Sequence, residues 1–158
     1  MTRPARLDAL LAFSALTSLA AIGIALVSQH VYDIQPCPWC VLQRLIFVAI
    51  GAAALLGLAW RSALGGKLAA AAMAALASCG IAAALWQHFV AAASASCNLT
   101  FADRLMNATG LNRALPDLFM AYASCADAQV ILWGVPYEFY SLTLFVVAIL
   151  AAWRAGRG

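Results

Sequence analysis

Cys37-Pro38-Trp39-Cys40-Val41-Leu42-Gln43-Arg44 leads into an almost wholly apolar run that continues to Trp60. Two cysteines separated by two residues can close a small disulfide ring, and this spacing is typical of a redox-active pair. The apolar run is long enough to cross a bilayer as a helix, which takes about 20 residues. The sequence therefore predicts a dithiol at the mouth of a membrane-spanning helix, with Arg44 one helical turn deeper.

The whole chain has the composition of an integral membrane protein. Of its 158 residues, 66% are hydrophobic and 9% are charged, whereas a soluble domain carries about 25% charged residues. We expect an all-α integral membrane fold, a four-transmembrane-helix bundle that forms a single membrane domain. The expected spans cover residues 7–28, 41–60, 68–93 and 138–153, and they leave a short link at 61–67 and two longer loops at 30–40 and 94–137.

Positive charge is distributed unevenly between the two ends of this bundle. Six cations belong to the termini and the short link, namely Arg3, Arg6, Arg61, Lys67, Arg154 and Arg157. The opposite end carries three, Arg44, Arg104 and Arg113. By the positive-inside rule, we expect both termini in the cytoplasm and both longer loops outside. The net charge of +3 reflects this asymmetry, so no nucleic-acid partner is expected.

The cysteines gather in the two longer loops. Four of the five lie there, as Cys37, Cys40, Cys97 and Cys125, while Cys79 falls in the third span. The outer side of a bacterial inner membrane is oxidising, so disulfides can form and persist on that side. We expect Cys79 to be a small apolar residue in a helix interface.

Two stapling disulfides are the structural alternative for the four loop cysteines. A ring closed by Cys37 and Cys40 constrains little of the unfolded chain, so it makes a poor staple. No metal site is expected, because Cys97 and Cys125 lack the spacing of a zinc pair. Four cysteines allow three pairings, and the residues alone do not choose among them.

The residues around Cys40 favour electron exchange between thiols and a lipid-soluble acceptor. Unpaired N–H groups at the helix start favour a thiolate on Cys40. Arg44 lies on the same face and could hold that thiolate or an acceptor that becomes negative on reduction, although interfacial arginines also simply snorkel. Gln43 could add a hydrogen bond. His88 could donate a hydrogen bond or a proton to the reduced acceptor, or be only a hydrated interfacial residue.

The loop before Cys125 is amphipathic in part. Its apolar residues recur at helical spacing at Phe101 and Leu105, and again at Leu115, Leu118 and Phe119. We expect this segment to form helix on the membrane surface and to hold the loop cysteines near the bilayer.

With these features the sequence resembles the DsbB family of disulfide bond formation proteins of bacterial inner membranes. The resemblance is carried by Cys37-x-x-Cys40-x-x-Gln43-Arg44, by the two further cysteines in a second outer loop, and by four spans with cytoplasmic ends. Leu115-Pro116-Asp117, Ser124-Cys125-Ala126-Asp127 and Trp133-Gly134-Val135-Pro136 also look like that family.

The resemblance implies a thiol:quinone oxidoreductase of the inner membrane. It implies that Cys97 and Cys125 exchange with a periplasmic, thioredoxin-fold oxidase of the DsbA type, and that Cys37 and Cys40 exchange with this second pair. Cys40 would face a quinone, either ubiquinone or menaquinone, with Arg44 and His88 polarising it.

Two rival functions remain. An enzyme like the vitamin K epoxide reductases combines a four-helix bundle with C-x-x-C, but its active dithiol follows the loop cysteines, whereas here Cys37 and Cys40 precede them. The other rival is a structural membrane protein with two stapling disulfides.

Overall fold

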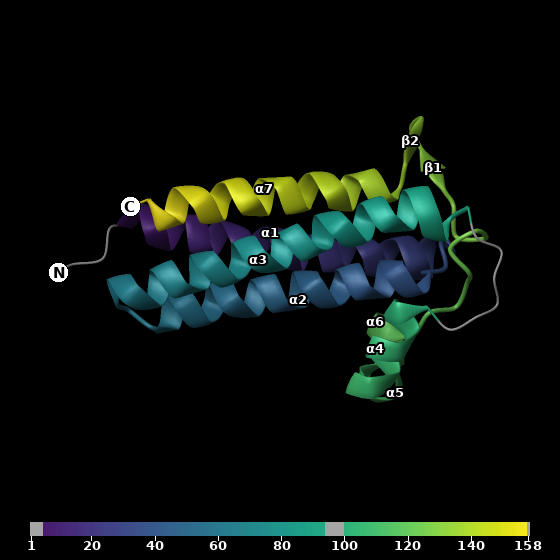
Figure 1. Ribbon diagram of the computed structural model, residues 1–158, viewed down its shortest axis with the longest axis horizontal. Helices are drawn as coiled ribbons and strands as arrows, with labels where there is room; N and C mark the ends of the chain where they lie inside the picture. Colours follow the sequence, from purple (N-terminus) through teal and green to yellow (C-terminus); the bar gives the residue numbers. More distant parts are fainter. Residues whose placement is uncertain (1–4, 94–99, 158) are drawn as a thin grey trace.

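The computed structural model of the protein describes residues 5–93 and 100–157, and four long helices run side by side through this part of the chain (Figure 1). They are α1 (Ala5–Val31), α2 (Pro38–Ala59), α3 (Ala63–Trp86) and α7 (Glu138–Gly156). Each is long and apolar enough to cross a membrane, with α3 continuing into a π-helical turn, η1 (Gln87–Ala91). The fold is therefore the predicted four-helix membrane bundle.

The helices form a closed ring in which one seam is looser than the others. α2 packs extensively against α1 and α3, and α3 against α7, whereas α1 and α7 share a smaller contact. The start of α1, the end of α7 and the α2–α3 connection lie at one end of the bundle, and all the longer connections lie at the other (Figure 1). This places Cys37, Cys40 and Cys125 at the end with the longer connections.

Small residues allow the helices to approach closely. A Cβ on Gly80 would lie 2.5 Å from the ring of Phe145, and a Cβ on Gly57 would lie 2.5 Å from the Cβ of Ala69. The Phe145 ring stacks on Phe47 at a centroid distance of 4.2 Å, which joins α7 to α2 in the middle of the core. Because lipid supplies no hydrophobic force between helices, such close packing is what holds a membrane bundle together.

The third helix starts earlier than the sequence predicted. Residues 63–67 were expected to belong to the link, but α3 begins at Ala63. The Ser62 hydroxyl accepts a 3.0 Å hydrogen bond from the Gly65 N–H, and Gly65 lies directly against the Trp60 ring. The Ser62 hydroxyl thus accepts from one of the unpaired N–H donors of the first turn, so the helix can begin before its most apolar part.

Cys79 does not lie in a helix interface, as the sequence analysis expected. Its side chain is exposed on the outer face of α3. The buried positions of α3 nearest to it are Ala77 and Gly80, on the face that packs inward.

The segment between η1 and α7 forms three short helices beside α2, α4 (Phe101–Thr109), α5 (Leu111–Ala114) and α6 (Pro116–Phe119). Figure 1 shows this group projecting from the side of the bundle. Thr100 and Asp103 form a capping box that starts α4. Buried Met106 and Phe119 pack against Val41 at the start of α2. The predicted amphipathic segment is therefore helical, and its apolar face covers the first turn of α2.

A small hairpin precedes α7. Strands β1 (Ile131–Leu132) and β2 (Val135–Pro136) pair antiparallel, with Leu132 opposite Val135. The turn between them uses positive φ angles at Trp133 (50°) and Gly134 (82°), which matches the twist of a two-residue hairpin. An all-α fold was predicted, so this hairpin is an addition to it.

Candidate functional site

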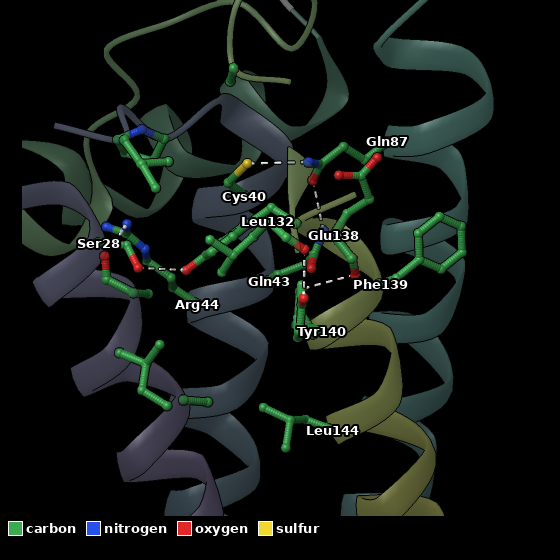
Figure 2. A pocket seen from close by; sticks show the side chains of 18 of the residues that line it. Ser28, Cys40, Gln43, Arg44, Gln87, Leu132, Glu138, Phe139, Tyr140 and Leu144 are labelled. Atoms are coloured by element: carbon green, nitrogen blue, oxygen red, sulfur yellow. Dashed lines mark hydrogen bonds between the residues drawn. The ribbon is translucent and has the colours of Figure 1, made fainter. Parts of the chain in front are cut away.

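A cavity of about 770 Å³ lies at the loop end of the bundle, between α1, α2 and α7. Figure 2 shows Cys40, Gln87 and Glu138 at its polar end and Leu144 at the opposite end. Its apolar walls include Ala21, Ile22 and Ile24 of α1, Phe47 of α2 and Leu144 of α7. Ile24 and Thr143 line the cavity and are also exposed, so the cavity reaches the outer surface of the bundle between α1 and α7.

The dithiol lies at the first turn of α2. Cys37 is the N-cap residue, with extended backbone angles, and its sulfur accepts a 3.3 Å hydrogen bond from the Cys40 N–H. Pro38 occupies the first turn, where a missing N–H costs nothing. The two Sγ atoms lie 2.8 Å apart. Cys37 is fully buried, whereas Cys40 lines the cavity, so the two sulfurs face different surroundings.

Cys125 lies beside Cys37, and neither of these two residues lines the cavity. The two side chains are hydrogen-bonded, and Cys125 is buried. Two N–H groups of the second loop, those of Tyr122 and Ala123, donate to the Pro36 carbonyl at 3.0 and 3.3 Å. These bonds join the two loops directly beside the dithiol and bring Cys125 to Cys37.

The raised pKa of Cys37 follows from this packing. Burial raises the pKa of the Cys37 thiol well above its usual value, and the hydrogen bonds to Cys125 and Cys40 add to the rise. Cys37 therefore holds its proton and can donate it in a hydrogen bond to the Cys40 sulfur.

The structure places three of the four predicted catalytic cysteines together. Cys37, Cys40 and Cys125 form one cluster, described above. Cys97 lies outside the described residues, so its predicted role stays a prediction.

Arg44 is buried beside the cavity and is held by neutral oxygens. Its Nη1 donates to Gln29 Oε1 at 2.7 Å and to the Leu118 carbonyl at 3.4 Å, and its Nη2 donates to the Ala25 carbonyl at 3.3 Å. Within residues 5–93 and 100–157, no carboxylate pairs with it. An unneutralised buried cation stabilises negative charge that develops nearby. Only 6% of Arg44 is exposed, so its guanidinium lies within protein.

Gln43 contacts Cys40 indirectly. Its Nε2 donates to Gln87 Oε1 at 2.8 Å, and Gln87 Nε2 donates to Cys40 Sγ at 3.3 Å. Gln43 and Gln87 both line the cavity and are both buried (Figure 2). Gln43 was predicted as a cofactor-binding residue, and the structure places it at the polar end of the cavity.

His88 lies one layer behind the cavity wall. Its Nδ1 is 2.6 Å from Glu138 Oε1, and the imidazole packs edge-on against Phe89 and Phe139. Glu138 lines the cavity, whereas His88 is absent from its lining and its side chain is 31% exposed. Any contact of His88 with a molecule in the cavity would therefore pass through Glu138.

Three residues of the site were not identified from the sequence. Gln29 orients Arg44, Gln87 contacts Cys40, and Glu138 links the cavity to His88. All three are buried polar side chains on apolar helices. That pattern is the signal that could have identified them, since buried polar groups in a membrane span mark functional positions.

Two tyrosines tie together the elements that line the loop side of the cavity. The Tyr137 hydroxyl donates to Ser28 Oγ at 3.1 Å, which ties the start of α7 to α1. The Tyr140 hydroxyl donates to the Leu132 carbonyl at 2.8 Å, which holds the hairpin over the cavity. The hairpin and the start of α7 therefore line the loop end of the cavity, where Trp133 and Val135 are exposed, while Ile24 and Thr143 are exposed on its flank.

Taken together, the geometry connects a buried thiol cluster to an apolar cavity through one sulfur. Cys37 lies between Cys125 and Cys40, and Cys40 lies between Cys37 and the cavity. Disulfide exchange requires a thiolate to approach a disulfide sulfur, and this order of sulfurs allows exchange along the chain Cys125–Cys37–Cys40.

Comparison with known proteins identifies the family. A family model described as "Disulfide bond formation protein DsbB" matches residues 7–155. Proteins named Disulfide bond formation protein B from Herminiimonas arsenicoxydans and Nitrosospira multiformis are 32% and 34% identical to this chain. These alignments cover 86% of this chain and 86% of the first relative, and 90% of this chain and 81% of the second. The relative from Verminephrobacter eiseniae is 34% identical, over 94% of this chain and 87% of its own length. The match extends over all four helices and the cysteine cluster, and the chain therefore belongs to the DsbB family of disulfide bond formation proteins.

Proposed function

We propose that this protein reoxidises a periplasmic dithiol oxidase of the DsbA type and passes the electrons to a membrane quinone. The observation that carries the proposal is the position of Cys40, whose sulfur contacts Cys37 on one side and borders the apolar cavity on the other. Family membership supports disulfide-forming oxidoreductase activity. The specific acceptor and partner are our proposal.

The cavity suits a quinone. A quinone has two carbonyl acceptors on a flat ring and an apolar tail, so it needs donors at one end of its site and apolar walls elsewhere. Gln43 and Arg44 lie at one end, and Ile22, Phe47 and Leu144 line the rest. When bound, the quinone takes up two electrons and two protons from the dithiol. Ubiquinone and menaquinone both have these features, so both fit this description of the site.

The chain's own residues move the electrons by two exchanges. Oxidation of Cys37 and the Cys40 thiolate forms their disulfide: the electron pair leaves to the acceptor, one proton comes from the Cys37 thiol, and the second proton reaches the acceptor through Glu138. A Cys125 thiolate then attacks the Cys37 sulfur beside it, which breaks the Cys37–Cys40 bond and leaves the pair of electrons on Cys40. The Cys97 thiolate then attacks Cys125, which forms the Cys97–Cys125 disulfide, breaks the Cys125–Cys37 bond and returns Cys37 to a thiol. The partner dithiol exchanges with the Cys97–Cys125 disulfide in turn, so that the partner becomes oxidised and Cys97 and Cys125 are reduced.

Arg44 and His88 have complementary roles in this proposal. Arg44 stabilises the negative charge that forms on Cys40 or on the acceptor, since its own charge is not neutralised by a carboxylate in the described chain. His88 and Glu138 form a route for protons between the cavity and the exposed edge of η1.

We place the loop end of the bundle in the periplasm of a bacterial inner membrane and both termini in the cytoplasm. The support is the charge asymmetry, because the six cations Arg3, Arg6, Arg61, Lys67, Arg154 and Arg157 belong to the end opposite the cysteines. Only on the oxidising side would the cysteines reach a periplasmic partner.

The test measures quinone consumed against partner thiols oxidised. Purified protein is mixed with a reduced DsbA-type oxidase and a soluble quinone, and both reactants are followed by absorbance and thiol titration. We expect one quinone to be consumed for each partner dithiol oxidised, and no turnover in Cys40→Ser. Cys79→Ser is the matched control, since Cys79 is exposed on α3 away from the cluster, and it should turn over at the wild-type rate.

A structural protein with two stapling disulfides predicts a different outcome. In that case Cys37→Ser would leave periplasmic disulfide formation unchanged in cells, and the purified protein would consume no quinone. Either result would refute the proposed function.

A further inference from the structure

We propose that Gln87 is a catalytic residue that stabilises the Cys40 thiolate and that Gln43 is a positioning residue that fixes the orientation of Gln87. This inference deepens the proposed function, in which Cys40 carries the electron pair between the thiols and the acceptor. It rests on two hydrogen bonds that form a chain from Gln43 through Gln87 to the Cys40 sulfur.

The chain of hydrogen bonds fixes which end of the Gln87 amide faces the sulfur. Gln43 Nε2 donates to Gln87 Oε1 at 2.8 Å, so the oxygen of Gln87 is occupied. The NH₂ group of Gln87 is then turned toward Cys40 and donates to its Sγ at 3.3 Å. Without the donor on Gln43, the Gln87 amide could turn its oxygen toward the sulfur. An oxygen there would repel a thiolate instead of stabilising it.

Burial strengthens the two hydrogen bonds, from Gln43 to Gln87 and from Gln87 to Cys40. Gln43 is 3% exposed and Gln87 is 6% exposed, so water does not compete for their amides. A hydrogen bond to a charged group is stronger than one between neutral groups, and a low dielectric strengthens it further. Figure 2 shows the two glutamines and Cys40 meeting at the polar end of the cavity.

The local backbone places Gln87 at this position. Gln87 is the first residue of η1, the π-helical turn that follows α3. A π-helical turn carries an extra residue compared with a regular helix and often occurs at functional sites. The turn changes the direction of the following side chains, so that Gln87 is directed at Cys40 while the adjacent His88 reaches Glu138.

The charged and titratable groups around Cys40 come from three sides. On its own helix and cap are Arg44 and Cys37. From the hairpin and α7 come Tyr137, Glu138 and Tyr140, which line the same cavity. η1 contributes His88, which pairs with Glu138, and the part of α1 that lines the cavity contributes no titratable side chain.

The step that needs this stabilisation is the release of Cys40 from a disulfide. When the Cys125 thiolate attacks Cys37, the Cys125–Cys37 bond forms, the Cys37–Cys40 bond breaks, and the electron pair stays on the Cys40 sulfur. A leaving thiolate is expelled faster when its negative charge is stabilised. Arg44 supplies a cation, and the Gln87 N–H supplies a directed hydrogen bond.

The experiment measures the pH dependence of Cys40 alkylation in the reduced full-length protein. Iodoacetamide is used without quinone or partner, and modification of Cys40 is resolved by peptide mass spectrometry. The variants are Gln87→Met, Gln43→Met and the double variant, with Gln129→Met as the matched control. Gln129 is an exposed amide that binds the Ala92 carbonyl, remote from the dithiol. Methionine keeps the length of the side chain and removes the N–H donor.

We expect Gln87→Met to move the midpoint of Cys40 alkylation upward by about one to two pH units, the effect of one hydrogen bond to a charged group. Gln43→Met should produce a shift in the same direction. The double variant should shift no further than Gln87→Met, because Gln43 acts through Gln87. Gln129→Met should leave the midpoint unchanged.

Gln87→Glu serves as a second variant with the shape of glutamine. It places a carboxylate against the sulfur, so it should shift the midpoint upward by at least as much as Gln87→Met. An unchanged midpoint in both Gln87 variants would overturn the catalytic role of Gln87, and additive shifts in the double variant would overturn the positioning role of Gln43.

The alkylation experiment can fail or succeed independently of the quinone assay that tests the proposed function. If the wild-type protein consumed no quinone while the alkylation midpoints shifted as expected, the proposed function would fail and the amide chain would stand. If quinone were consumed but the midpoints did not move, the amide chain alone would fail.

Discussion

The Nδ1 atom of His88 lies 2.6 Å from the Oε1 atom of Glu138, and the two residues come from η1 and the first turn of α7. Glu138 borders the cavity, and His88 extends to the exposed edge of the bundle. The pair therefore connects the inside of the cavity with the exposed surface of the bundle. Reduction of a quinone consumes protons as well as electrons, so a connection of this kind has a chemical use in the proposed reaction.

The first prediction concerns this pair. Glu138→Gln keeps the shape of the side chain but removes its ability to carry a proton. We expect the rate of quinone reduction to fall by roughly 10²-fold, which is the usual contribution of a positioned acid–base group. The measurement is the single-turnover rate with excess soluble quinone. His30→Gln is the control, because His30 is exposed at the end of α1 and does not line the cavity. A wild-type rate in Glu138→Gln would exclude the proton route.

The second prediction concerns Arg44. Arg44→Gln removes the cation but retains a hydrogen-bond donor beside Gln29. We expect KM for quinone to rise about 10- to 100-fold, since hydrogen bonds involving a charged group contribute about 1.5–3 kcal/mol. Steady-state kinetics over a range of quinone concentrations would measure this. Arg104→Gln, an exposed change on α4, should leave KM unchanged, and an unchanged KM in Arg44→Gln as well would show that Arg44 has no role in binding.

The third prediction concerns Cys37. Its raised pKa means that the folded protein holds this proton more tightly than the unfolded chain does. Alkylation of Cys37 in the folded, reduced protein should therefore begin at higher pH than in the denatured protein, where a thiol has a pKa of about 8.5. By linkage, the reduced protein should lose stability as the pH rises through that value and above. Alkylation and thermal unfolding between pH 7 and 10 would test both, and equal alkylation midpoints in the two states would contradict the prediction.

The fourth prediction concerns the contact between the second loop and α2. Phe119 is buried and packs with Met106 on Val41, next to the dithiol. Phe119→Ala should weaken the seating of this loop and slow the formation of a Cys37–Cys125 disulfide in a Cys40→Ser background, by about 10-fold or more, because large-to-small changes at buried aromatics cost about 3–5 kcal/mol. Leu115→Ala, at an exposed position, is the control. Equal rates of cross-linking in the two variants would show that the packing of Phe119 does not position Cys125.

The fifth prediction concerns the packing of the bundle. A Cβ on Gly80 would lie 2.5 Å from the Phe145 ring, whereas a Cβ on Gly23 would meet nothing within 4 Å. Gly80→Ala should destabilise the protein by about 1–3 kcal/mol, the usual cost of overpacking a core. Gly23→Ala should be neutral or slightly stabilising, because alanine favours helix. The midpoint of thermal unfolding in detergent would distinguish them, and equal midpoints would contradict the packing argument.

The sequence was sufficient to predict the four spans and the Cys37–Cys40 dithiol, because both depend on local patterns, whereas the approach of Cys125 was implied only by the family resemblance. A run of apolar residues predicts a span wherever it occurs, and Cys37-x-x-Cys40 predicts a dithiol without knowledge of the rest of the fold. The boundary at Ala63 was predicted wrongly for a physical reason. Ser62 and Gly65 start a helix by a hydroxyl cap and a close approach to Trp60, and hydropathy does not register either effect.

The polar network behind the dithiol required the structure. Gln29, Gln87 and Glu138 lie on three different helical segments, and their roles depend on which face of each helix turns inward. The same reason explains the error at Cys79, since a helix that is apolar all round does not reveal which side contacts lipid. His88 was noticed from its sequence position, but its partner Glu138 was visible only once η1 and α7 lay together.

The opening between α1 and α7 has a consequence for how the electron acceptor reaches the cavity. Ile24 and Thr143 put an opening on the flank of the bundle, so the lipid-soluble acceptor of the proposed function would enter the cavity from within the plane of the bilayer. The relevant concentration is then the number of acceptor molecules per area of bilayer. Under the proposed function, a cell that changes the quinone content of its membrane would change how fast its exported proteins acquire their cross-links, with no alteration of this protein or of its soluble partner.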